Sequence, residues 1–148
     1  MQQELWAECA RPTVAALSTV FAADLVRVSD LTLSRGRFNE RLRQPRPPLD
    51  VAEDDVERLL LAFEELTSNG LRHGGAPVRV TVTASVQGWL IDVADAAVEQ
   101  PPRPAIDRDP ARGGLGLYLV ARLSQQHGWS VEGTFKHVWA CLRPAQLA

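Results

Sequence analysis

One long helix, predicted over residues 50–73, limits the folds open to this chain more than any other part of the sequence. Its apolar residues recur every three or four positions and make one wide face: Val56, Leu59, Leu60, Phe63, Leu66 and Gly70. A face of this width has to be buried, so the helix must lie against another layer of the domain. The Gly74-Gly75 pair follows directly and is expected to end the helix.

The same helix carries a polar row, nearly opposite its apolar face. Glu65, Asn69 and Arg72 are spaced i, i+4 and i+7, so their side chains project from one side. A carboxylate, a carboxamide and a guanidinium in line suit a metal-bound triphosphate, as proton acceptor, magnesium ligand and phosphate clamp. A solvated helix face would give the same spacing. Leu61 and Ala62 flank the row, which favours the wall of a pocket.

The second half of the chain is predicted to be β-rich. Residues 78–86 alternate apolar and polar, as in a half-buried antiparallel strand. Residues 87–88 are a plausible hairpin turn into a strand over 89–95, whose Trp89, Ile91 and Val93 would face the core. Residues 129–133 and 136–142 supply a last hairpin.

A segment without periodicity runs from Glu99 to Arg112 and carries four prolines. Irregular stretches of this length inside a compact domain are usually lids or linkers. Gly113, Gly114 and Gly116 then open an apolar helix, where backbone amides could approach an anion. The order of these glycines is not that of a P-loop, and a plain loop is the alternative.

Asp95 ends the strand predicted over 89–95 and is followed by Ala96 and Ala97. A carboxylate here could accept a hydrogen bond from the exocyclic amine of adenine. An aspartate that bonds to the backbone of its own turn is the alternative.

Residues 1–46 are predicted to form an N-terminal helical segment, which the proline-rich run over 44–50 ends. Its apolar residues follow a spacing of three and four: Val14, Leu17, Phe21, Val28, Leu31, Phe38 and Leu42. The near-heptad period is typical either of a dimerisation helix or of a helix packed on its own domain. Residues 47–148 would form the second part of the chain.

Composition excludes several classes of protein. The chain has 148 residues, of which 45% are apolar and 23% charged, as in one globular domain. A net charge of −2 gives no general attraction to nucleic acid. Cys9 and Cys141 have neither metal-ligand nor redox spacing. With no signal sequence and no run long enough to span a membrane, a cytoplasmic protein is expected.

Taken together, these motifs resemble the GHKL ATPase superfamily. The Glu-x-x-x-Asn helix, the aspartate after a strand, the proline-bearing lid and the Gly-Leu-Gly-Leu helix entry are similar to its bacterial anti-sigma-factor serine kinase branch. The resemblance covers residues 50–143. It implies the Bergerat fold, an α/β (α+β) two-layer sandwich with a mixed, mostly antiparallel sheet and helices on one face.

The resemblance also implies roles for individual residues. Glu65 would be the catalytic base, and Asn69 would bind both ATP and Mg²⁺. The remaining residues of the implied ATP site are Arg72, His73, Asp95, Gly113, Gly114, Leu115, Gly116 and Leu117. Arg108 and Arg112, in the lid, would stabilise charge in the transition state, and Lys136 would be a structural residue of the last hairpin.

The implied partners are ATP with Mg²⁺, a sigma factor or an anti-anti-sigma-like antagonist, and a second copy of the chain in a homodimer. Direct contact with nucleic acid or membrane is not expected. The family has glycine where this chain has Ala97 and Glu99, so a partner-binding module with weak or no ATP binding is an alternative. A histidine-kinase-like output domain is another, although the N-terminal segment contains no histidine to accept a phosphoryl group.

Overall fold

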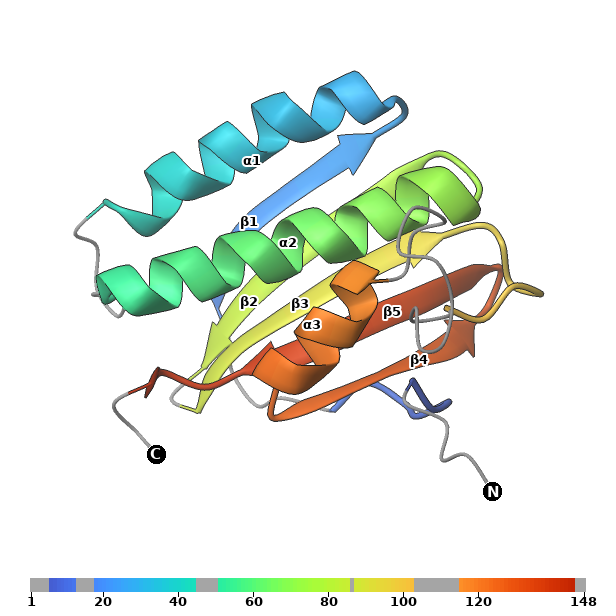
Figure 1. The fold of residues 1–148 in the computed structure, drawn as a ribbon. Helices are drawn as coiled ribbons and strands as arrows, with labels where there is room; N and C mark the ends of the chain where they lie inside the picture. Colours follow the sequence, from blue (N-terminus) through green and yellow to red (C-terminus); the bar gives the residue numbers. More distant parts are fainter. Residues whose placement is uncertain (1–5, 13–17, 45–50, 86, 103–114, 146–148) are drawn as a thin grey trace.

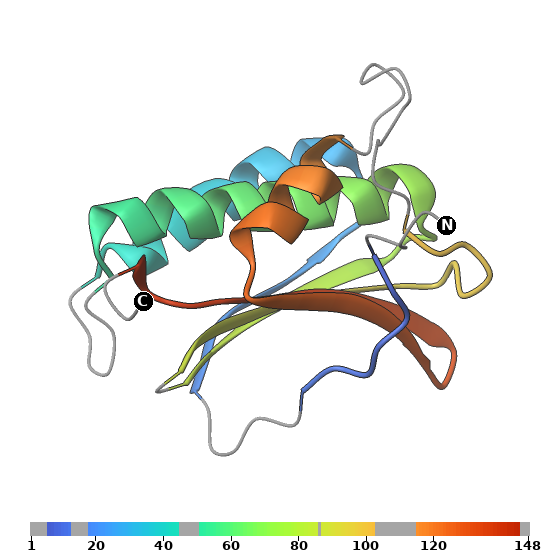
Figure 2. The ribbon, with the colours of Figure 1, turned by 60° about the horizontal axis from the view of Figure 1, so that its bottom comes forward.

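The computed structural model describes residues 6–12, 18–44, 51–85, 87–102 and 115–145. It is a two-layer sandwich, in which three helices lie on one face of a five-stranded sheet (Figures 1 and 2). The strands are β1 (Ser18–Leu25), β2 (Val78–Ser85), β3 (Gly88–Asp95), β4 (Gln126–Glu132) and β5 (Phe135–Leu142), and the helices are α1 (Val28–Leu42), α2 (Glu53–His73) and α3 (Leu115–Leu123). The predicted α/β sandwich is confirmed.

The sheet is antiparallel throughout its five strands, whereas a mixed, mostly antiparallel sheet was predicted. Its strand order is β1-β2-β3-β5-β4, and all four strand pairs are antiparallel. Glu8 adds an isolated parallel bridge to Trp129 of β4. Alternate residues of the three central strands face the helices and are buried: Val78, Val80, Val82, Ala84, Trp89, Ile91, Val93, Val138, Ala140 and Leu142.

Helix α2 lies over the middle of this apolar layer. All six residues of its predicted apolar face are buried. The helix approaches the sheet closely at Gly70, where an added Cβ would lie 3.1 Å from Val93 Cγ1 and 3.2 Å from Val78 Cγ1. This close approach fixes the polar row of α2 above the end of β3, where the candidate site forms.

The helix predicted over the whole N-terminal segment is wrong for residues 18–25, which form strand β1 and pair with β2. A register shift between Thr19 and Phe21 marks a β-bulge. In a regular strand, Val20 would point to the face opposite Phe21 and Leu25. Because of the bulge, Val20 and Leu25 are both buried, and Phe21 is partly buried. The bulge obscures the two-residue period of the strand, so its apolar residues imitate helical spacing.

The helical prediction holds for α1, which packs beside α2 (Figure 1). Leu31, Phe38 and Leu42 are buried in the core of this same chain. Phe38 stacks on Phe63 with ring centroids 4.8 Å apart, and Phe21 contacts both rings. Of the other residues of the predicted stripe, Val28 is exposed, and Val14 and Leu17 lie outside the described residues. The buried part of the stripe is used within the domain, and the homodimer stays a prediction.

Residues 6–12 are not helical either; they form an extended strap that crosses the sheet on the side opposite the helices (Figure 2). Trp6 is buried, and its indole N–H donates to the carbonyl of Gly128 at 3.0 Å. At the other end of the strap, Arg11 forms ion pairs with Asp92 and Glu132. Through the bridge from Glu8 to Trp129, the strap pairs with the outer edge of β4, whose backbone groups would otherwise have no strand partner.

Among the described residues, none of the helices has the length and apolar character needed to cross a membrane. Cys9 and Cys141 are both free thiols.

Candidate functional site

The polar row of α2 faces the first turn of α3 across a small cleft. This α2–α3 cleft is lined by Glu65, Ser68, Asn69, Arg72, His73, Gly116 and Leu117. Six of these seven residues were singled out from the sequence, and they come from two helices separated by more than forty residues of chain. Glu65, Asn69 and Ser68 are partly buried, whereas Arg72 and His73 are exposed.

Glu65 lies against the backbone of α3. A Cβ added to Gly116 would overlap the Glu65 carboxylate, so a larger residue at this position would force one of the two to move. Burial raises the pKa of the Glu65 carboxyl, and the like charge of Glu64 raises it further, while the nearby Arg72 lowers it. The carboxylate is therefore partly withdrawn from water and has a stronger affinity for a proton than an exposed glutamate.

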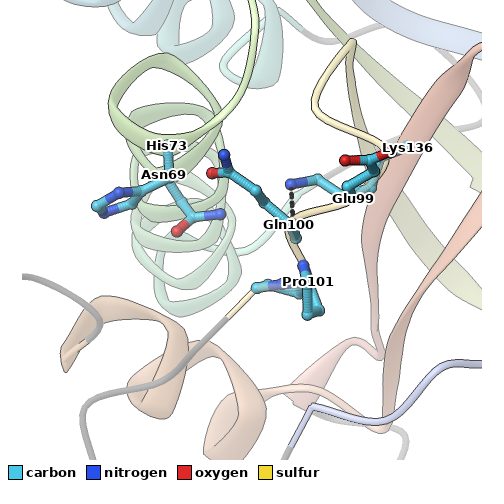
Figure 3. A pocket seen from close by; sticks show the side chains of 7 residues that line it. Asn69, His73, Glu99, Gln100, Pro101 and Lys136 are labelled. Atoms are coloured by element: carbon cyan, nitrogen blue, oxygen red, sulfur yellow. Dashed lines mark hydrogen bonds between the residues drawn. The ribbon is translucent and has the colours of Figure 1, made fainter.

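A larger cavity adjoins the α2–α3 cleft, because Asn69 and His73 line both. This second space, the Lys136 cavity, has a volume of about 330 Å³ and is lined by Asn69, His73, Glu99, Gln100, Pro101, Pro102 and Lys136. Figure 3 shows Asn69 on α2 and Lys136 on β5 with Gln100 between them, while the imidazole ring of His73 points away from Lys136. The cavity and the cleft share Asn69 and His73 and together make up the candidate site along the C-terminal half of α2.

Asp95 lies at the end of β3, beneath this site, and has no exposed surface. Its Oδ1 accepts a hydrogen bond from the Ala97 N–H at 2.8 Å, so the turn bond that was the alternative interpretation is present. Its Oδ2 has no hydrogen-bond partner among the described residues and lies 3.5 Å from the ammonium of Lys136. Burial raises the pKa of the Asp95 carboxyl, against the opposing effects of the Ala97 N–H and Lys136.

A glycine makes room for this carboxylate. A Cβ at Gly74, directly after α2, would lie 2.6 Å from Asp95 Oδ2. The Gly74-Gly75 pair thus ends the helix and also lets the chain pass over Asp95. The sequence suggested only the first of these two roles.

Four of the residues predicted from the sequence lie outside the described part of the chain: Arg108, Arg112, Gly113 and Gly114. Leu115 begins α3, and Gly116 and Leu117 lie in its first turn.

Sequence reasoning missed Ser68, Gln100 and the role of Lys136 as site residues. Lys136 was expected to be structural, yet it lines the larger cavity and is buried. A signal was present, because Lys136 is the only lysine among the 16 lysine and arginine residues of the chain. Ser68 and Gln100 carry no comparable signal, since serine and glutamine are common on exposed helices and turns.

Comparison with known proteins bears directly on this site. The comparison with curated proteins gives no match. A family model described as the histidine kinase-like ATPase domain matches residues 37–142. The match includes α2, Asp95, α3 and Lys136, and so spans every described element of the candidate site. Because it covers well over half of the chain, the protein belongs to the histidine kinase-like ATPase domain family.

Proposed function

We propose that this protein is an ATP- and Mg²⁺-dependent regulator of the anti-sigma-factor serine kinase type, which phosphorylates or sequesters a signalling partner in the cytoplasm. One observation carries the proposal: Glu65, Asn69 and Arg72 line one cleft with the glycine-bearing first turn of α3. A proton acceptor, a neutral oxygen ligand and a cation beside a helix N-terminus are the groups that phosphoryl transfer requires.

Features of the Lys136 cavity support it as the place of the adenine base. The Lys136 cavity offers about 330 Å³ beside a buried carboxylate oxygen that has no hydrogen-bond partner among the described residues. An exocyclic amine would satisfy that oxygen, which supports Asp95 as the group that recognises adenine. The triphosphate would then extend along α2 toward Arg72 and Gly116 in the adjoining cleft.

Asn69 is the residue best placed to hold Mg²⁺, because its side chain lines both spaces. No three His, Cys, Asp or Glu side chains converge on a metal position in the part of the chain that the structure describes. Mg²⁺ commonly uses one or two protein oxygens together with substrate phosphates and water, and Asn69 suits that arrangement.

Glu65 would accept the proton of the attacking hydroxyl. Its raised pKa makes it a better base than an exposed glutamate, and contact with Gly116 holds its carboxylate at the mouth of α3. A serine hydroxyl must lose its proton as it attacks phosphorus, whereas a neutral imidazole nitrogen need not. This requirement favours an alcohol over a histidine as the acceptor.

Replacement of Glu65 by glutamine tests the proposal. Glu65→Gln should lose ATP turnover by roughly a hundredfold or more, as expected for a general base, yet still bind ATP in calorimetry. Glu64→Gln is the matched control, because Glu64 is the adjacent residue and pairs with Arg35 on the surface rather than lining the cleft. Equal turnover by wild type and Glu65→Gln would contradict a base at this position.

A non-catalytic partner-binding module is the second candidate. It is supported by Glu99, a carboxylate that lines the cavity, and by Ala97 at the place of a family glycine. In that case, calorimetry with Mg²⁺ and millimolar ATP would detect no binding by the wild-type protein. Binding to the partner would then be the same for wild type and Glu65→Gln.

A further inference from the structure

Lys136 and Asp95 form a buried pair on the helix-covered face of the sheet. They are register partners on β5 and β3, and their side chains are 1% and 0% exposed. A lysine buried to this extent is uncommon and requires compensation from partners. Here its ammonium donates to the carbonyl oxygen of Gln100 at 2.6 Å and lies 3.5 Å from Asp95 Oδ2 (Figure 3 draws the first bond).

This pair leaves one donor and one acceptor side by side. An ammonium group has three N–H donors. Within the described residues, Gln100 accepts one N–H, and Asp95 Oδ2 lies 3.5 Å from the nitrogen in an ion pair and faces a second, so one N–H of Lys136 remains. Oδ2 of Asp95 likewise lacks a hydrogen-bond partner in the same part of the chain.

Lys136 is the nearer of the two to a ligand. It lines the cavity, whereas Asp95 lies next to Lys136 and has no exposed surface of its own. The Asp95 carboxylate balances the lysine charge, so this end of the site would not attract a phosphate. Arg72 and the first turn of α3, in the other space, are the better phosphate end.

We propose that Lys136 is a base-recognising residue, which donates a hydrogen bond to the ring nitrogen beside the exocyclic amine of a 6-aminopurine nucleotide. That amine is flanked by two acceptors, N1 and N7, so a donor next to Asp95 matches either edge of the base. The inference rests on the proposed function and adds to it a second specificity-determining side chain. The ligand would contact Lys136 directly, in addition to any contact with Asp95.

Nucleotides that lack one ring nitrogen test this contact. Calorimetry would compare ATP, 1-deaza-ATP and 7-deaza-ATP on wild type and on Lys136→Met. One of the two analogues should bind wild type roughly ten- to a hundredfold more weakly than ATP, as expected for loss of a hydrogen bond to a charged group. Lys136→Met should bind that analogue and ATP with equal affinity, whatever its overall affinity.

The ratio of the affinity for ATP to the affinity for the analogue separates base recognition from protein stability, because a general loss of stability would weaken both. Lys136→Met leaves the Asp95 carboxylate buried without its cation, so its fold is checked by circular dichroism, and the measurement in the next paragraph needs no variant. His137→Gln is the control, because His137 is adjacent on β5 but contacts Asp92 on the opposite face of the sheet. It should keep the wild-type ratio.

A spectroscopic measurement needs no variant. Since Lys136 is the only lysine, protein labelled with ¹³C-lysine gives a single Cε resonance. Saturating ATP should shift that resonance, and the weaker analogue at saturation should shift it less.

Equal affinities of wild type for all three nucleotides, or a Cε resonance that ATP does not move, would overturn the role of Lys136 and leave the proposed function standing. Failure of wild type to bind ATP at all would overturn the proposed function itself.

Discussion

At the scale of single residues, the contact between Gly116 and Glu65 is the most constrained point of the site. A methyl group at position 116 would overlap the Glu65 carboxylate, which is held in turn by the long helix α2. Either Glu65 must rotate away or the first turn of α3 must move. Both outcomes would displace Glu65, the residue that we propose as the proton acceptor.

We therefore expect Gly116→Ala to lower ATP turnover by about tenfold or more, since a misplacement of 1 Å can cost a hundredfold. Gly36→Ala is the matched control, because Gly36 is an exposed residue of α1 and a Cβ added there would have no other atom within 4 Å. That substitution should stabilise the protein by about 1 kcal/mol through helix propensity. Thermal unfolding and ATP turnover are measured for both variants. Normal turnover by Gly116→Ala would contradict the proposal that the Gly116–Glu65 contact positions the base.

The raised pKa of Glu65 predicts how activity and stability depend on pH. The base must be ionised, so kcat/KM should fall on the acid side at a higher pH than the ordinary glutamate value of about 4.3 would give. A pKa raised by folding stabilises the protein below the unfolded pKa, and this stabilisation is lost as the pH rises through the folded pKa.

Glu65→Gln should accordingly be more stable than wild type at pH 7. The gain in the free energy of unfolding should be below about 1 kcal/mol, because the half-buried side chain is screened by solvent. It should disappear near pH 3, where the carboxyl is protonated in both folded and unfolded states. Chemical denaturation at the two pH values measures this difference, and a less stable variant at pH 7 would contradict it.

At the scale of elements, the apolar stripe of α1 belongs to the core. Phe38 is fully buried against Phe21 of β1 and Phe63 of α2, so it joins three elements. Phe38→Ala should lower the free energy of unfolding by about 3–5 kcal/mol. Leu33→Ala, on the exposed side of the same helix, should change it by less than about 0.5 kcal/mol. If chemical denaturation showed that both variants lose a similar amount of unfolding free energy, the exposed side of α1 would also be packed against a partner.

Sequence patterns identified most elements where their period was regular. Helix α2, strands β2 and β3 and the last hairpin, β4–β5, agree with the predictions. Strand β1 was missed because its bulge disrupts the alternation, and the strap because its contacts are with β4, which follows more than a hundred residues later.

At the scale of the whole molecule, the strap connects the start of the chain to the far edge of the sheet. Trp6 is 1% exposed, packs on the ring of His127 and bonds to Gly128. Trp6→Ala should therefore cost about 3 kcal/mol in the free energy of unfolding. Phe135→Ala, a partly exposed aromatic on β5, should cost less than about 1 kcal/mol. A neutral effect of Trp6→Ala would mean that the strap leaves the sheet in solution.

The sequence by itself determined the polar row of α2, because the row depends on the spacing of residues within one helix; the two-layer sandwich was implied by the resemblance to a known family. The sequence also placed Gly116 and Asp95 as candidates, since helix entries and strand ends have local signatures. Only the tertiary structure decided that Glu65 meets Gly116, that Lys136 pairs with Asp95, and that α1 is buried. These contacts join residues far apart in the chain. They depend on strand order and helix packing, which the local spacing of residues does not reveal.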